Sequence, residues 1–137
     1  VLQNSHKTIT VNGHQVNMIG LDDCMLGYPD PEPAFAGLAA GSLQILIAHE
    51  PDMIDEIQPN LPVHLFIAGH SHGGQVRLPF CQQLITPPYA KHYIRGWYHK
   101  DEPNDANTPV FVTTGIGSTH VPIRFFNVPE IVTIYLK

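Results

Sequence analysis

The chain has 137 residues, of which 43% are hydrophobic and 14% are charged, and its formal net charge at pH 7 is −5. This balance predicts a globular domain with a buried core and excludes an intrinsically disordered chain. The basic residues form no cluster, which argues against a general grip on nucleic acid, and no apolar run is long enough to cross a bilayer. Nine histidines in so short a chain are the first unusual feature.

The first part of the chain predicts a hairpin, a loop and a short helix. Asn12-Gly13 lies between alternating apolar residues and is typical of a tight turn, so we expect residues 8–21 to form a β-hairpin. Residues 22–33 are polar and contain proline, which indicates a loop. A short helix is expected over residues 34–40, ended by Gly41.

Two buried strands joined by a helix follow. Residues 43–48 and 63–68 are short, nearly continuous apolar runs, typical of strands that are buried on both faces. Pro51 suits the first turn of a helix, and residues 52–57 continue it. The order strand, helix, strand predicts two parallel strands with a crossover connection.

The remainder of the chain predicts three more strands around a long excursion. Apolar and polar residues alternate over residues 75–80, which favours a strand. Residues 81–108 are aromatic and interrupted by prolines, so we expect a surface excursion, followed by strands over 110–114 and 131–136. No linker is evident, so the fold class is α/β with a mixed sheet, in one domain or subdomain spanning residues 1–137. The two cysteines, Cys24 and Cys81, are expected to be reduced, partly buried thiols.

Three histidines directly follow the two buried strands. His49 follows the first strand, and His70 and His72 follow the second within Gly-His-Ser-His-Gly-Gly. Ligands in open α/β sheets bind beyond the carboxyl ends of the strands, and neutral imidazole is a common ligand for Zn, Fe, Mn and Ni. On an extended backbone, histidines two apart face the same side. We therefore predict a metal site at these three residues. His64 is interpreted as a packed or edge residue of its strand. Four histidines are interpreted as surface residues: His6, His14, His92 and His99. The role of His120 is left open.

These motifs resemble a known family. The segment 49–52 (His-Glu-Pro-Asp) and the segment 69–79 (Gly-His-Ser-His-Gly-Gly-Gln-Val-Arg-Leu-Pro) resemble the last two metal motifs of calcineurin-like metallophosphoesterases. The closest likeness is to the bacterial branch of small, often membrane-associated phosphohydrolases. Segments 115–117, 122–125 and 129–131 resemble the closing part of that branch, so the likeness runs from about Gly20 to the end of the chain.

The resemblance implies a fold, a chemistry and ligands. The fold would be the C-terminal half of a β-sandwich flanked by helices, with the metals where the two sheets meet. His49 and His70 would bind one divalent ion and His72 another, the ions being Mn, Fe, Zn or Ni. Two such ions about 3.5–4 Å apart would generate a hydroxide that attacks a phosphate ester or anhydride. The implied partner is the substrate, which would be a phosphate-containing small molecule or a lipid-linked phosphate. Phosphodiesters are among the substrates that the resemblance implies.

The chain also departs from the family pattern. The family's Asp-x-His motif, its metal-bridging Asp and its Asn-His-Asp motif lie N-terminal to the matched part, and this sequence contains neither tripeptide. Asp22 and Asp23 carry suitable carboxylates, but their order along the chain does not match the family's motifs, so we do not assign them as ligands. The resemblance therefore implies that the missing N-terminal half of the domain is a partner, and that this chain alone is inactive.

Two alternatives remain open from the sequence. Residues 69–73 also fit Gly-x-Ser-x-Gly, the nucleophile elbow of α/β-hydrolases, with Ser71 as nucleophile, Asp101 or Asp105 as the acid, and His120 as the base. That elbow must open a helix, whereas a strand is predicted here, and His49 would have no role. The third interpretation is a non-catalytic metal-binding fragment.

Overall fold

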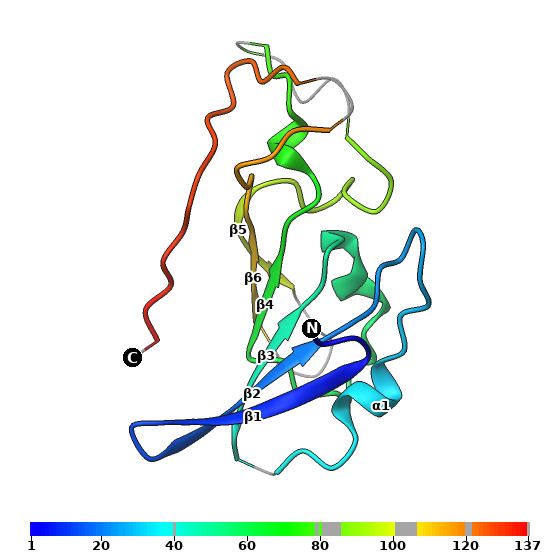
Figure 1. Cartoon of the computed structure of the whole chain (residues 1–137), viewed down its shortest axis with the longest axis vertical. Coiled ribbons are helices and arrows are strands. Elements are labelled where there is room, and N and C mark those ends of the chain that lie inside the picture. Colours follow the sequence, from blue (N-terminus) through cyan, green and yellow to red (C-terminus); the bar gives the residue numbers. More distant parts are fainter. Residues whose placement is uncertain (40, 79, 81–85, 101–106, 120–121, 137) are drawn as a thin grey trace.

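The central feature of the computed structural model is one six-stranded sheet in the order β1-β2-β3-β4-β6-β5 (Figure 1). The model describes residues 1–39, 41–78, 80, 86–100, 107–119 and 122–136. The strands are β1 (Ser5–Val11), β2 (His14–Gly20), β3 (Leu43–Ile47), β4 (Leu65–Ala68), β5 (Gly96–Lys100) and β6 (Thr108–Val112). The inner strands β2, β3, β4 and β6 run parallel, and β1 and β5 pair antiparallel at the two edges. The predicted α/β class with a mixed sheet is confirmed.

The predicted hairpin and crossover are both present. Asn12 and Gly13 have φ angles of 50° and 83°, as a type I′ turn requires at both central positions. The connection from β3 to the parallel strand β4 passes through η1 (Pro51–Glu56). This helix is a 3₁₀ helix.

The short helix α1 (Pro31–Phe35) begins three residues before the predicted segment and ends at Phe35. The side chain of Asp30 accepts a hydrogen bond from the Glu32 N–H, and Pro31 occupies the first turn, where its missing N–H costs nothing. The expectation of residues 34–40 was wrong because it overlooked this N-cap; Ala40 lies outside the described residues.

Three predictions in the second half of the chain need correction. Residue 79 lies outside the described residues, and the rest of the predicted strand over 75–80 forms only an isolated bridge between Val76 and Phe125. Residues 131–136 lie in no strand. Conversely, β5 falls within the segment predicted as a surface excursion and pairs with β6. Strand propensity depends on an available partner, which the local pattern cannot reveal. Cys81 lies outside the described residues, and Cys24 is a free, partly buried thiol as expected.

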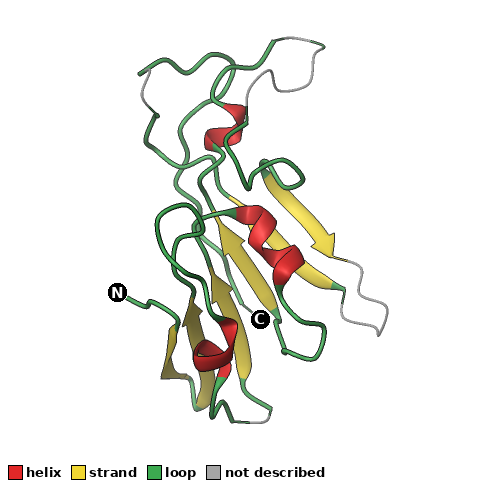
Figure 2. Cartoon of the chain, turned by 90° about the vertical axis from the view of Figure 1, so that its right-hand side faces the viewer, coloured by secondary structure: helices red, strands yellow, loops and turns green. Residues whose placement is uncertain are grey.

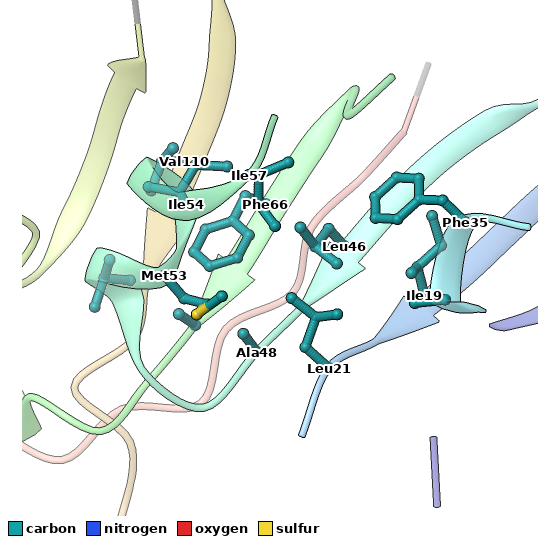
Figure 3. Packing of buried hydrophobic residues seen from close by; sticks show 13 residues of the cluster. Ile19, Leu21, Phe35, Leu46, Ala48, Met53, Ile54, Ile57, Phe66 and Val110 are labelled. Carbon is teal, nitrogen blue, oxygen red and sulfur yellow. The ribbon is translucent and has the colours of Figure 1, made fainter. Parts of the chain in front are cut away.

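The main core lies on the face of the sheet that α1 and η1 cover (Figure 2). Leu46 and Phe66, from the two central strands, are fully buried there with Ile54 of η1 at 2% exposure (Figure 3). Full burial of such a side chain contributes roughly 1.5–3 kcal/mol. The packing of Met53 and Ile54 against the sheet also fixes η1, which follows a candidate ligand.

The opposite face of the sheet is apolar and only partly covered. Val16, Ile45 and Leu65 form a second, smaller cluster against which Ile134 of the C-terminal segment packs. A hollow of about 970 Å³ lies over this face. The second sheet that a β-sandwich implies is not found among the described residues. Within the same residues, no helix has the length and apolar character needed to span a membrane.

Candidate metal centre

The parallel strands bring their following segments to one edge of the sheet. The hydrogen-bond ladder continues beyond the strand ends through four backbone contacts: Leu21 N–H to Ile47 O, Ala48 N–H to Ile67 O, Gly69 N–H to His49 O, and Thr113 N–H to Ala68 O. The segments after β2, β3, β4 and β6 are therefore neighbours. The first three carry the Asp22-Asp23 pair and the candidate histidines.

His49 and His70 lie side by side at this edge. The Nδ1 atom of His70 is 3.0 Å from the Nε2 atom of His49. The His70 Nε2 atom is 2.9 Å from the carbonyl oxygen of Pro88; since a carbonyl only accepts, Nε2 carries the proton and Nδ1 of neutral His70 presents a lone pair. Two nitrogens that bind one ion at about 2.0–2.1 Å lie roughly 3.0–3.4 Å apart, so the observed separation suits a shared ion.

His72 is not part of the cluster of His49, Glu50 and His70, but it lies close enough for the charges of His70 and His49 to contribute to lowering its pKa. Its Nδ1 atom lies 3.2 Å from the carbonyl oxygen of Gly117 and 3.4 Å from a guanidinium nitrogen of Arg124. Burial lowers the pKa of His72 below its usual value, and the positive charge of Arg124 adds to this effect. The imidazole is therefore neutral at pH 7, the form that binds metals. The assignment of His49, His70 and His72 as a common ligand set stays a prediction.

Glu50 is a site residue that the sequence interpretation did not assign. It is fully buried, at 0% exposure. One carboxylate oxygen accepts from the Cys24 N–H at 3.2 Å, and the other has no hydrogen-bond partner among the residues that the structure describes. Ligand atoms of His49, Glu50 and His70 all lie within 4.8 Å of one another. The motif His-Glu-Pro-Asp contained Glu50, but nothing in the local pattern showed that its carboxylate turns inward beside two imidazoles.

The carboxylates of the loop after β2 have structural partners. Asp22 accepts hydrogen bonds from the N–H groups of Asp23 and Tyr28, and Asp23 accepts from Met25 and Leu26. The Gln3 side chain lowers the pKa of Asp22, and the Leu26 N–H lowers that of Asp23. Asp23 nevertheless lies near His49 and Glu50, because both contribute to lowering its pKa.

The backbone after β4 is not extended as the sequence argument assumed. His70 and His72 have φ angles of 62° and 46°, and Gly73, Gly74 and Gln75 are also positive. Residues other than glycine rarely adopt positive φ angles, and they keep this conformation only where the surrounding structure holds them. Gly73 also approaches Asn127 closely, because a Cβ at this position would lie 2.7 Å from the Asn127 amide.

Ser71 has the surroundings of a structural residue. It is 1% exposed, its hydroxyl donates to the carbonyl oxygen of Ile94, and the same oxygen accepts from the Gly73 N–H. The element that follows is the short 3₁₀ turn η2 (His72–Gly74), which contains a non-helical residue. A nucleophile elbow needs an exposed serine that opens a helix. The proposed partners Asp101, Asp105 and His120 lie outside the described residues.

The other described histidines are not part of the cluster of His49, Glu50 and His70, and His120 lies outside the described residues. His64, which was predicted to lie inside its strand as a packed or edge residue, is exposed and directly precedes β4, where it exchanges hydrogen bonds with the backbone of Gln44. His14 and His99 are exposed, and His92 pairs with Asp55 at the surface. His6 is partly buried and contacts the carbonyl oxygen of Ala34, so its interpretation as a surface residue is only partly right.

These donors fit a divalent metal ion. Two imidazole nitrogens and a carboxylate oxygen are ligands that Zn, Mn and Fe accept. The second ring nitrogen of His70 donates to a backbone carbonyl, as is usual for a metal-binding histidine. The unpaired, buried oxygen of Glu50 is the observation that a cation would best explain, because a buried anion is costly without a counter-charge.

The fold and this donor set define an α/β protein with a candidate metal centre at the carboxyl edge of a parallel sheet. The chain is 39% identical over its full length to the metallophosphoesterase YkuE of Bacillus subtilis, covering 46% of it. It is 29% identical to the phosphodiesterase YaeI of Escherichia coli, over 99% of this chain and 47% of that protein. A transmembrane protein with a metallophosphoesterase domain from Danio rerio is 33% identical over 88% of this chain and 28% of its own length.

Relatives that match the chain over all or nearly all of its length are thus named as a metallophosphoesterase and a phosphodiesterase, which supports the calcineurin-like metallophosphoesterase family that its motifs resemble. The chain spans about half the length of the bacterial relatives named above. No protein-family model matches the chain. No solved structure matches it either.

Proposed function

We propose that this chain supplies the C-terminal part of a metal-dependent phosphoesterase site. His49 and His70 would hold one divalent ion and His72 a second. The observation that carries the proposal is the pair of imidazole nitrogens 3.0 Å apart, beside a buried carboxylate with an unpaired oxygen. Two bound divalent ions would offset phosphate charge and lower the pKa of a water molecule for attack on a phosphate ester or anhydride.

Glu50, His72 and Arg124 each have a part in this scheme. Glu50 contributes a buried negative charge close to both histidines. His72 presents a neutral ring. Arg124 places a positive charge beside His72 and donates hydrogen bonds to the carbonyl oxygens of Thr114 and Gly115. It thereby holds the loop after β6 against the site, where a positive charge favours a phosphate anion.

The proposal also includes the substrate and the N-terminal half of the domain. We propose a phosphate-containing small molecule or a lipid-linked phosphate as substrate. The apolar face of the sheet around Val16, Ile45 and Leu65 would pack against the N-terminal half of the domain, which would contribute the bridging carboxylate and the remaining ligands. A second cation cannot be held close to the first without such a bridge, because the two ions repel each other.

The test compares this chain with the longer protein that contains it, in a chromogenic phosphodiester assay with added Mn²⁺. We expect the longer protein to turn over, and chelation or His72→Ala to abolish turnover, with the exposed His99→Ala as matched control. The isolated chain should bind Mn²⁺ in a calorimetric titration and hydrolyse nothing.

Three results would redirect the proposal. Labelling of Ser71 by a fluorophosphonate, with activity that survives a chelator, would favour the serine hydrolase. Metal binding without turnover in the longer protein would indicate a non-catalytic metal-binding protein. Robust turnover by the isolated chain that vanishes in its His72→Ala variant would mean that a carboxylate such as Asp23 completes the site.

A further inference from the structure

The carboxylate of Asp52 binds the backbone of the loop that contacts His70. One oxygen of Asp52 accepts from the Lys91 N–H at 2.7 Å, and the other accepts from the N–H groups of His92 and Tyr93 at 3.0 and 3.2 Å. The Asp52 N–H in turn donates to the carbonyl oxygen of Tyr89 at 3.0 Å. Four hydrogen bonds therefore join this residue to the backbone of residues 89–93.

Asp52 is itself fixed to the core. It lies in the first turn of η1 between buried neighbours, Pro51 before it and Met53 and Ile54 after it. Its position thus follows from the packing of η1 against the sheet rather than from solvent-exposed contacts. The same helix directly follows the His49-Glu50 segment in the chain.

The anchored loop delivers one group to the candidate metal centre. Ala90 is fully buried, and its N–H donates to the carbonyl oxygen of Pro87, which closes the turn that contains Pro88. The carbonyl oxygen of Pro88 then accepts the Nε2 proton of His70 at 2.9 Å. This contact leaves the Nδ1 lone pair of His70 facing His49.

We propose that Asp52 is a positioning residue for His70, acting through the loop from Pro88 to Tyr93. Its carboxylate fixes the loop, the loop fixes the Pro88 carbonyl, and that carbonyl fixes the orientation and the tautomer of the His70 ring. The metal-binding part of this inference rests on the function proposed above, whereas the hydrogen-bond chain does not. Partners that orient a ligating histidine commonly change metal affinity by about 10- to 100-fold when removed.

The first experiment observes His70 without metal. An imidazole N–H proton held in a hydrogen bond exchanges slowly, so the metal-free protein should show an N–H resonance that His70→Ala removes. We expect Asp52→Ala to abolish that resonance. Asp52→Asn should weaken it, because the amide oxygen still accepts from His92 and Tyr93 while the amide NH₂ opposes the Lys91 N–H. Asp55→Ala is the matched control, because Asp55 lies on η1 and contacts side chains of the same loop.

The second experiment titrates Mn²⁺ into the same variants. The dissociation constant should rise about 10- to 100-fold in Asp52→Ala, less in Asp52→Asn, and little in Asp55→Ala. An unchanged His70 resonance and unchanged Mn²⁺ affinity, with only a lower melting temperature, would overturn the positioning role. If Asp52→Ala does not fold, Asp52→Asn decides in the same way. If the resonance responds as expected but the unmodified protein binds no Mn²⁺, the positioning role stands and the proposed function fails.

Discussion

At the scale of single residues, Glu50 decides the electrostatics of the candidate centre. A buried carboxylate oxygen without a partner costs about 1–3 kcal/mol or more, and Glu50 has such an oxygen beside His49 and His70. The same charge also acts on Cys24. Burial raises the pKa of that thiol to about 12, and the negative charge of Glu50 adds to the effect.

We predict opposite effects of Glu50→Gln on metal affinity and on stability. The amide keeps the shape and removes the charge, so the dissociation constant for Mn²⁺ should rise about 10- to 100-fold. The metal-free protein should be as stable or more stable, because an unpaired buried charge is gone. Calorimetric titration and urea unfolding measure the two effects, with the exposed Glu56→Gln as control. Unchanged metal affinity together with lower stability would show that Glu50 is a structural residue.

At the scale of elements, the segment after β4 depends on left-handed backbone. Gly73 and Gly115 have φ angles of 60° and 61°, but their surroundings differ. A Cβ at Gly73 would lie 2.7 Å from Asn127 and from the Thr114 methyl group, whereas a Cβ at Gly115 would meet no atom of the described residues within 4 Å. The pair therefore separates the conformational cost of a side chain from the steric cost.

We expect Gly115→Ala to lower the free energy of unfolding by about 1 kcal/mol, the usual cost of a side chain in this region. Gly73→Ala should lower it by roughly 2–4 kcal/mol, because overlap with packed neighbours adds to the same cost. Urea unfolding of both variants provides the measurement. Equal losses would mean that the loop moves away without penalty, and that the close packing around Gly73 does not hold the histidine segment in place.

At the scale of the whole molecule, the two faces of the sheet are unequal. One carries the main core beneath α1 and η1. The other presents Val16, Ile45 and Leu65 beneath a broad hollow, with Met18 and Ile67 only partly buried beside them. An apolar surface of this kind is unusual for a monomer and favours association.

We predict that the isolated 137-residue chain self-associates through this face. Sedimentation velocity should show association that grows with concentration, and Ile67→Lys should reduce it by placing a charge in the apolar face. Leu26→Lys, at an exposed residue outside the hollow, is the matched control. Equal association of both variants, or a chain that stays monomeric at high concentration, would contradict the prediction.

Features that depend on neighbouring residues follow from the sequence alone. Asn12-Gly13 determined the hairpin, because both residues accept positive φ. The apolar runs determined β3 and β4, and their order put His49 and His70 beyond parallel strands. That topology brings both histidines to one edge, where their nitrogens lie 3.0 Å apart, so the strands that locate the candidate site could be predicted without the structure.

Features that depend on distant partners arise only in the folded protein. Residues 131–136 have a strand-like pattern but no paired neighbour among the described residues, whereas β5 forms because β6 lies beside it. The contacts of Asp52 join residues that are separated by 39 to 41 positions in the chain. The inward turn of Glu50 depends on the Cys24 loop. Hydrogen bonds and burial at such separations arise from the folded arrangement, and no local pattern encodes them.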